Sequence, residues 1–397
     1  MKFSQRVQAV SPFLAMEFGK RAAALEAAGH PVIKLNIGEP DFGAPPAVLA
    51  RLEAHTRTTR FTYTDAPGLP ALRAAIAGFY RSAHGIDIDP QRVIVTSGAS
   101  AALLLVTAAL VDPGDAVIVG DPSYPCNRHF LASFGAEVTL VPTDASTRFQ
   151  LDLAAVQAHW TPRTRGLLIA TPSNPTGTSV APQELAAICS WARQQQAWRI
   201  IDEIYLDLGD RDAQGRAPPS VLAHDPDAVV ISSFSKYFGM TGWRLGWCVV
   251  PSEMVPVMER LAQNYYICPP TPAQYAALEC FTPESIAVCE QRRAEFFARR
   301  TLVLQGLAQA GLAVPVAPDG AFYVYFSVAG TGLDSMRFCE RMLEEHHVAL
   351  TPGHDFGHAS AATHVRLSFA ASREELAEGL QRLDRFVRQL QTEAQAR

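Results

Sequence analysis

The chain has 397 residues, of which 48% are hydrophobic and 18% charged, with a formal net charge of −5. This composition fits a globular protein with one large and one smaller domain, and it gives no electrostatic case for binding nucleic acid or an anionic membrane. The longest apolar run, residues 103–111, is too short to span a bilayer.

The first predicted elements form an N-terminal helix and strand. Glu17 and Lys20 interrupt the apolar positions near the start, so the segment lacks a signal-peptide core and we expect a cytoplasmic protein. Residues 11–29 predict a helix. Residues 32–37 predict a strand that runs into the turn-rich loop 38–42.

From residue 69 to residue 250, short β-branched runs alternate with helical patterns. The predicted strands are 93–96, 116–119, 138–141, 166–170, 199–202, 229–232 and 247–250. The predicted helices are 69–83, 100–111, 125–134, 181–196 and 252–265. Because these strands are apolar on both faces, the pattern predicts an α/β fold with a mainly parallel seven-stranded sheet and flanking helices.

The pattern changes to an α+β unit after about residue 283. The predicted helices are 284–310, 334–346 and 372–393, and the predicted strands are 313–317, 321–327, 347–350 and 363–369. We therefore predict a large domain of residues 45–282 and a small domain made of residues 1–44 and 283–397.

The segment 232–246 contains a lysine, Lys236, among hydroxyls, small residues and aromatics, with Arg244 eight positions on. A lysine held in such a site can form a Schiff base with an aldehyde. The arginine and hydroxyls such as Ser233 suit a phosphate, so the segment suggests pyridoxal phosphate (PLP). The alternatives are an exposed loop lysine and the Ser-x-x-Lys motif of penicillin-binding hydrolases, whose Lys-Thr-Gly partner is absent.

A second candidate group follows the predicted strand 199–202. Asp202 ends this apolar strand, where a carboxylate is costly unless it is paired. The cationic ring nitrogen of PLP would pair with it, which makes the ring an electron sink. Tyr205, three residues on, could reach the ring hydroxyl. The alternative is an ordinary acid at a strand end.

Two loops after predicted strands offer further polar groups. Prolines and a glycine shape the irregular loop 171–177, in which a cis bond before Pro175 is possible and Asn174 can present its amide to a ring oxygen or a carboxylate. Small residues at 96–102 lead into a helix whose N-terminus could bind an anion. Ser100 adds a hydroxyl there, although serine is also an ordinary helix cap.

The predicted strand 363–369 carries one arginine. Alternation places Arg366 on one face, with Val365 and Leu367 on the other. Its planar fork could bind a carboxylate, or the residue could be a solvated strand position.

In combination, these segments resemble the class I/II aminotransferases of PLP fold-type I, in family order and over nearly the whole chain. The resemblance runs from residues 36–42 through 63–68 to Arg366. It implies PLP as cofactor, with Lys236 as the Schiff-base lysine and Asp202 as the partner of the pyridine nitrogen. The other cofactor contacts that it implies come from Asn174 and Tyr205 at the ring hydroxyl, Tyr124 on the ring face, and Ala99, Ser100, Ser233 and Arg244 at the phosphate.

The resemblance also implies how substrates and a second subunit contribute. Gly38 and Arg366 resemble the carboxylate-binding pair, with Asn174 beside them. Tyr63 resembles the residue that reaches the phosphate of the neighbouring subunit, which implies a homodimer with shared sites. The implied reaction is ping-pong: Lys236 leaves its imine when an amino acid binds and then carries the Cα proton.

Substrate choice is the least defined part of the sequence. A related aspartate aminotransferase branch has a lysine where this chain has Ser100, so aspartate preference by that route is not implied. We expect 2-oxoglutarate as the acceptor. The open alternatives are a PLP-dependent β-lyase and a regulator of the same fold, although no winged helix precedes residue 30. Aromatic residues that could line the pocket, or else lie in the core or an interface, are Phe13, Phe42, Tyr63 and Tyr265-Tyr266.

We expect no metal site and no disulfide framework. His346-His347 falls at the end of a predicted polar helix without the ligand spacing of a zinc site. The cysteines are odd in number and lack a Cys-x-x-Cys, which indicates reduced buried thiols. They are Cys126, Cys189, Cys248, Cys268, Cys280, Cys289 and Cys339.

Overall fold

The computed structural model of the chain describes residues 1–4, 6–7 and 10–396. The predicted small domain includes residues 5, 8, 9 and 397, which lie outside the described residues. In the part that is described, no helix combines the length and apolar character that a membrane crossing requires.

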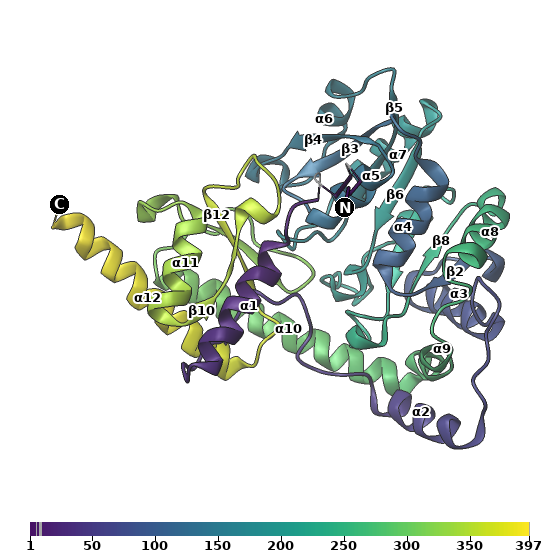
Figure 1. Cartoon of the computed structure of the whole chain (residues 1–397), viewed down its shortest axis with the longest axis horizontal. Helices are drawn as coiled ribbons and strands as arrows, with labels where there is room; N and C mark the ends of the chain where they lie inside the picture. The colour runs from purple at the N-terminus through teal and green to yellow at the C-terminus, as the bar shows by residue number, and fades with distance from the viewer. Residues whose placement is uncertain (5, 8–9, 397) are drawn as a thin grey trace.

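A seven-stranded sheet forms the centre of the larger part of the molecule (Figure 1). Its strand order is β2-β8-β7-β6-β5-β3-β4. The strands are β2 (Val93–Thr96), β3 (Ala116–Asp121), β4 (Glu137–Pro142), β5 (Thr164–Ala170), β6 (Trp198–Asp202), β7 (Val229–Ser233) and β8 (Gly246–Val249). Only β8 runs antiparallel to its neighbours, β2 and β7, so the predicted α/β fold with a mainly parallel sheet is confirmed.

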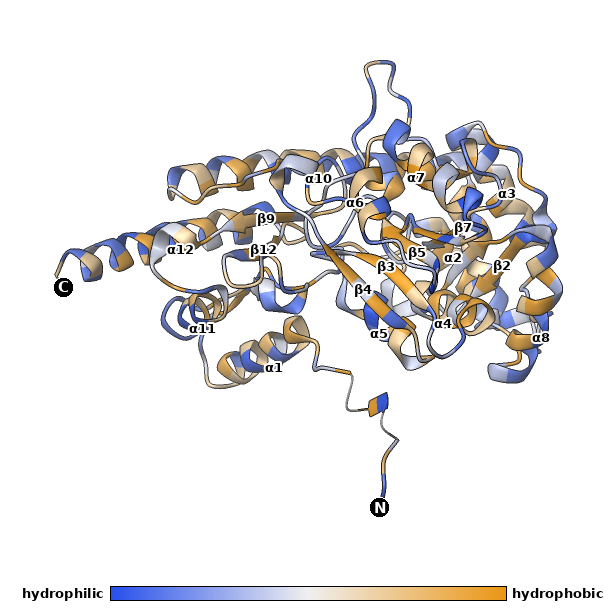
Figure 2. Ribbon diagram, turned by 90° about the horizontal axis from the view of Figure 1, so that it is seen from above, coloured by the Kyte–Doolittle hydropathy of each residue, from blue (hydrophilic) through white to orange (hydrophobic). Residues whose placement is uncertain are grey.

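Alternate residues of each strand enter two separate hydrophobic cores, one on each face of the sheet. In β5, Leu167 and Ile169 join one core while Leu168 joins the other. Helices α3 (Pro70–His84), α6 (Leu153–Ala158) and α7 (Pro182–Gln194) cover the first face, and α4 (Ala99–Leu110), α5 (Pro125–Ser133) and α8 (Val255–Tyr265) cover the second. Burial on both faces explains the hydrophobic (orange) strands β3 and β5 in Figure 2.

The smaller part of the molecule, which combines segments near both ends of the chain, contains two small sheets among the described residues. In one, β1 (Ile33–Lys34) pairs in parallel with β10 (Val348–Ala349). In the other, β12 (His364–Ser368) lies antiparallel between β11 (Thr351–Pro352) and β9 (Tyr323–Ser327). Helices α1 (Leu14–Ala27), α11 (Ser335–His346) and α12 (Arg373–Gln395) surround them. The long helix α10 (Pro283–Gln309) runs from beside α9 (Thr271–Ala277) to α12, and so joins both parts (Figure 1).

Several predicted elements need correction. The predicted strand 313–317 is wrong: the chain there is irregular, and Ala313 O accepts a single ladder-like bond from Ser327 N at 2.8 Å. Pro315 lacks the N–H that a continuing strand would need. The predicted strands 32–37 and 347–350 are shorter, because each pairs over only two residues. The N-terminal helix begins at Leu14, and α2 (Pro46–Thr58), α6, α9 and β11 were not predicted.

Candidate active site

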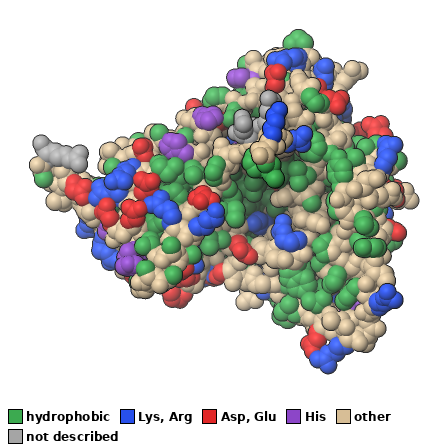
Figure 3. Space-filling model, viewed as in Figure 1, with side chains coloured by type: hydrophobic (Ala, Val, Ile, Leu, Met, Phe, Trp, Pro, Cys, Tyr) green, Lys and Arg blue, Asp and Glu red, His purple; other side chains and the backbone are tan. Residues whose placement is uncertain are grey.

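A cavity of about 610 Å³ opens beyond the carboxyl ends of the central strands, between α4, α1 and the three-stranded sheet. Figure 3 shows a hollow bordered by hydrophobic side chains on this face. Every predicted site residue except Tyr63 lines the cavity: Gly38, Ala99, Ser100, Tyr124, Asn174, Asp202, Tyr205, Ser233, Lys236, Arg244 and Arg366. The structure therefore brings together residues that are up to 328 positions apart, between Gly38 and Arg366.

Lys236 lies in the turn after β7, where it is partly buried. Its Nζ donates a hydrogen bond to Gly38 O at 2.5 Å and lies 5.9 Å from the centre of the Tyr205 ring and 5.8 Å from that of Phe322. Burial lowers the pKa of the Lys236 ammonium to about 8. A substantial neutral fraction near physiological pH makes this amine a nucleophile and a proton carrier.

Asp202 ends β6, the strand beside β7, and its side chain is buried. Its Oδ1 accepts a hydrogen bond from Ile204 N at 3.1 Å. Burial raises the pKa of Asp202 to about 6, and the same carboxyl lines the cavity. A buried carboxylate that faces a cavity favours a cationic partner there, and a protonated ring nitrogen fits that requirement.

Arg366 is 1% exposed, so the alternative of a solvated strand residue is wrong. Its Nη1 donates to Asn174 Oδ1 at 2.8 Å, and its Nη2 donates to Asn36 O at 2.6 Å and to Thr351 Oγ1 at 3.2 Å. Its Nε has no hydrogen-bond partner among the described residues. A buried guanidinium with an unused donor beside a cavity is suited to a carboxylate.

The opposite end of the cavity has the donors of a phosphate site. Gly98 adopts φ +88° before α4 begins, and a Cβ there would lie 2.8 Å from Arg244 Nη2. The glycine therefore lets the arginine lie against the helix N-terminus, where the first amides lack intrahelical acceptors. Ser233 and Ser235 lie alongside, with their hydroxyls 2.9 Å apart. Helix amides, hydroxyls and a guanidinium together fit a phosphate group.

The chain matches the family model for aminotransferase class I and II over residues 30–383. It belongs to this family. It is 40% identical to the valine–pyruvate aminotransferase of Mycobacterium tuberculosis over 380 residues, which cover 95% of this chain and 97% of that protein. It is 35% identical to the aspartate/prephenate aminotransferase of Thermus thermophilus, over 97% of this chain and 98% of that protein.

Solved aminotransferase structures share the fold. An aminotransferase from Mycobacterium tuberculosis superposes with a TM-score of 0.94 at 38% identity, covering 98% of this chain and 100% of that chain. The aspartate aminotransferase from Thermus thermophilus with maleate gives a TM-score of 0.91 at 34% identity, over 97% and 99% of the two chains. The family is known to use PLP, and the donors described above fit each part of that cofactor.

The aminotransferase cavity also contains residues that sequence reasoning missed. Tyr323 places its hydroxyl 2.9 Å from that of Tyr205, and α1 contributes Met16 and Lys20 to the lining. Phe13 lines the cavity, which was one of its two predicted alternatives. Phe42 instead packs on Phe296, with 5.0 Å between the ring centres. Tyr63, Tyr265 and Tyr266 are not part of the lining, and the first two are exposed.

The structure also shows the predicted proline bond, the cysteines and the histidine pair. The bond before Pro175 is cis, as are those before Pro122 and Pro172. All seven cysteines are free, and most of them are buried. His346 ends α11, and within residues 1–4, 6–7 and 10–396 no three His, Cys, Asp or Glu side chains are grouped as metal ligands.

Proposed function

We propose that this aminotransferase holds PLP through Lys236 and moves the amino group of an L-amino acid to a 2-oxo acid by a ping-pong mechanism. The observation that carries the proposal is the meeting of Lys236, Asp202 and Arg366 around one cavity. When bound, the cofactor supplies an electron sink for the charge that develops at the substrate Cα.

The side chains have distinct proposed roles. Arg366, with Gly38 and Asn174, binds the substrate carboxylate and so orients the Cα–H bond toward Lys236. Lys236 accepts that proton and returns it, which a lowered amine pKa favours. Asp202 holds the ring nitrogen protonated through its buried carboxylate.

The remaining proposed contacts hold the cofactor in place. Asn174 and Tyr205 bind the ring oxygen, and Tyr124 covers one face of the cofactor ring. The Phe13 ring meets the Tyr124 ring edge to face, with 5.9 Å between their centres. The phosphate contacts are Ala99, Ser100, Ser233 and Arg244.

We also propose a homodimer with shared sites, in two domains of residues 45–282 and of residues 1–44 with 283–397. Tyr63 supports the dimer, because 77% of this aromatic residue is exposed and it could enter the site of a second copy. The start of α10 at Pro283 supports the boundary. The free cysteines support a cytoplasmic location.

For the acceptor we propose 2-oxoglutarate, with pyruvate as the second candidate because the Mycobacterium tuberculosis relative is named a valine–pyruvate aminotransferase. The two acceptors differ in a distal carboxylate, which needs a cation. If Lys236, Arg244 and Arg366 act as proposed, Lys20 is the cation left for this carboxylate among the described residues that line the cavity. Its Nζ lies 2.7 Å from Glu17 Oε1.

We expect Lys20→Met to raise the KM for 2-oxoglutarate by up to about fivefold and to leave the KM for pyruvate unchanged, since an exposed ion pair contributes up to about 1 kcal/mol. The matched control is Lys34→Met, because Lys34 forms a similar pair with Glu26 at 2.9 Å but does not line the cavity. An equal change in the KM for both acceptors would show that Lys20 does not distinguish between them.

Loading of the cofactor should depend on pH. Because burial lowers the pKa of Lys236 to about 8, we expect PLP to load onto cofactor-stripped protein about tenfold faster for each pH unit up to that value, and then at a constant rate. Only the neutral amine attacks an aldehyde, and the fraction of neutral amine rises about tenfold per pH unit below the pKa and levels off above it. Stopped-flow absorbance measures the rate. A rate independent of pH from about 6 to 9 would contradict the expectation.

The direct test of the proposed function is a panel of amino donors against 2-oxoglutarate, pyruvate and oxaloacetate, with both products quantified. Amino transfer should require both substrates and give parallel lines in double-reciprocal plots. Release of ammonia and pyruvate without an acceptor would instead favour the β-lyase alternative, which none of the relatives named above supports. A cofactor-loaded protein with no oxo-acid-dependent turnover would refute the proposal.

A further inference from the structure

Two buried tyrosines from different sheets meet beside the cavity. Tyr205 follows β6 of the large sheet, and Tyr323 begins β9 of the small one. Their hydroxyl oxygens lie 2.9 Å apart, and their rings meet edge to face at 5.7 Å. Burial raises the pKa of both phenols, so each keeps its proton at neutral pH and has one hydrogen bond to donate.

The surroundings indicate which tyrosine donates. Among the described residues, the Tyr323 hydroxyl forms a hydrogen bond with Tyr205 alone. It also lies against the backbone of Gly38, where any Cβ would collide with it. Either hydroxyl can donate in this pair. A buried phenol proton without an acceptor is costly, and Tyr205 is the tyrosine proposed at the ring oxygen of the cofactor, so the arrangement that gives both protons an acceptor is the one in which Tyr323 donates to Tyr205. The proton of Tyr205 is then directed to an acceptor in the cavity.

Tyr323 contacts the carboxylate-binding arginine as well. The guanidinium carbon of Arg366 lies 4.6 Å from the centre of the Tyr323 ring. Arg366 in turn donates to Asn174 Oδ1 at 2.8 Å. The Tyr323 side chain therefore touches Tyr205 through its hydroxyl and Arg366 through its ring. Replacement by phenylalanine removes only the first contact, and replacement by leucine removes both.

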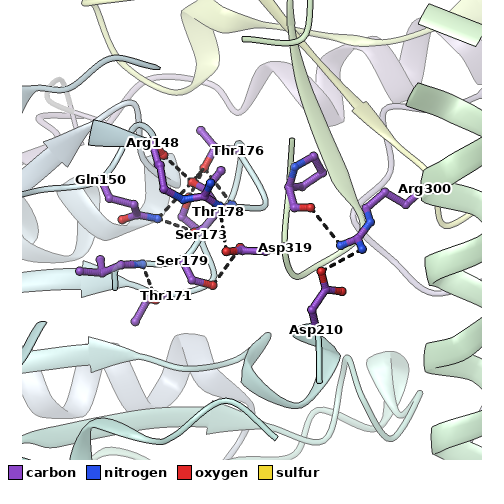
Figure 4. A network of polar contacts seen from close by, with 12 residues as sticks. Arg148, Gln150, Thr171, Ser173, Thr176, Thr178, Ser179, Asp210, Arg300 and Asp319 are labelled. Atoms are coloured by element: carbon purple, nitrogen blue, oxygen red, sulfur yellow. Dashed lines mark hydrogen bonds and ion pairs between the residues drawn. The ribbon is translucent and has the colours of Figure 1, made fainter. Parts of the chain in front are cut away.

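A polar network fixes the turn that precedes Tyr323 (Figure 4). Asp319 accepts hydrogen bonds from Arg148 Nη2 at 2.8 Å and from Ser179 Oγ at 3.0 Å. The amides of Asp319 and Gly320 donate to Gly177 O at 3.0 and 2.9 Å. These bonds hold the turn against loop 171–179, which carries Asn174, and therefore leave Tyr323 little freedom to move.

Arg300 of α10 holds the other side of the same turn. It donates to Pro318 O and to Asp210 Oδ2, both at 2.9 Å (Figure 4). A Cβ at Gly177 would lie 2.7 Å from Tyr323 O, so the loop and the start of β9 are in close backbone contact. The position of the Tyr323 ring is thus set from two sides, as a positioning residue requires.

We propose that Tyr323 is a positioning residue that donates a hydrogen bond to Tyr205 and thereby directs the proton of Tyr205 to the ring oxygen of the cofactor. This inference rests on the proposed function. A donor that itself accepts a hydrogen bond is strengthened, so Tyr323 increases the stabilisation that Tyr205 gives to negative charge on that oxygen.

Other charged and titratable groups face the same region and stay in place when only the Tyr323 hydroxyl is removed. They are Arg366 and Tyr124 near the phenols, and Asp202, Glu39 and Arg244 near Lys236. Because Tyr323→Phe changes none of them and retains the ring under Arg366, its effect reports the hydroxyl.

The test is a pH titration of the absorbance of the cofactor bound at Lys236. A nitrogen joins Lys236 to the cofactor, and loss of its proton leaves the negative charge on the ring oxygen unbalanced. A stronger hydrogen-bond donor to that oxygen therefore lowers the midpoint pH of this deprotonation. We expect Tyr323→Phe to raise the midpoint by about half a pH unit and Tyr205→Phe to raise it further. The double variant should match Tyr205→Phe, since Tyr323 acts through Tyr205.

The matched control is Tyr325→Phe on the same strand, which removes a hydroxyl bonded to Ser360 at 2.9 Å and should leave the midpoint unchanged. An unchanged or lower midpoint in Tyr323→Phe, or additive shifts in the double variant, would overturn the inference. Wild-type protein that carries no titrating cofactor would instead refute the proposed function. Tyr323→Leu, which removes the ring, should also raise the KM of the amino donor through Arg366.

Discussion

We expect Lys236→Ala to lose covalently attached cofactor and to lower kcat/KM by a factor of about 10⁴ or more. The substitution removes both the amine that joins the cofactor and the group that moves the Cα proton, and proton transfer alone contributes about 10² to 10⁴. Steady-state kinetics with the best donor and acceptor pair measures the fall in kcat/KM. Absorbance after dialysis measures the loss of the cofactor.

A thermal melt distinguishes this result from a loss of folding. Burial lowers the pKa of Lys236, so its charged form is less favourable in the folded protein than in water. We therefore expect the alanine variant to unfold at the same temperature as the cofactor-stripped wild type, or a higher one. A variant that keeps a tenth of the activity would show that another group carries the proton.

Replacing Arg366 with alanine should lower kcat/KM by about 10² or more, with KM as the main change. The variant loses the buried guanidinium that lies beside Asn174 and lines the cavity. The absorbance of the bound cofactor should remain, because Lys236 and Asp202 are untouched. Kinetics over a wide range of donor concentration measures the change in KM.

Arg366→Lys separates recognition from folding. Alanine removes the short hydrogen bond to Asn36 O and the bond to Thr351 Oγ1, and leaves Asn36 O with only the 3.4 Å bond from Thr351 Oγ1, which costs about 1 to 3 kcal/mol of stability. Lysine retains the charge but not the planar fork, so we expect near-normal stability and a KM that is still raised about tenfold. Loss of the cofactor absorbance in the lysine variant would argue against a carboxylate-binding role.

The large sheet could be predicted from the sequence because its strands are buried on both faces. Runs such as 166–170 are apolar at every position, and the structure places their alternate residues in two cores. The small sheets were harder, since β1, β10 and β11 have only two residues each and owe their pairing to distant segments. The apolar run 313–317 misled because Pro315 removes a donor without changing hydrophobicity.

The candidate site also contains residues that the local sequence predicts and residues that only distant packing brings in. Asp202 ends β6, and Asn174 and Lys236 lie in the loops that follow β5 and β7, so the sheet itself brings them to one edge. Tyr323 and Lys20 carry no local signal of function. They reach the cavity only because β9 and α1 pack there, which depends on contacts such as Asn36 Nδ2 to Ala15 O at 2.8 Å. Tyr63 requires a second copy of the chain for its proposed role.

Reduction of the cofactor-loaded enzyme with borohydride, followed by peptide mass spectrometry, directly tests whether Lys236 is the lysine that joins the cofactor. Borohydride converts the bond between the cofactor and its lysine into a stable amine. We predict a single pyridoxyl-modified peptide that carries the label on Lys236, and loss of the label in Lys236→Ala. A label on another lysine, or no label on protein that still transfers amino groups, would contradict the account.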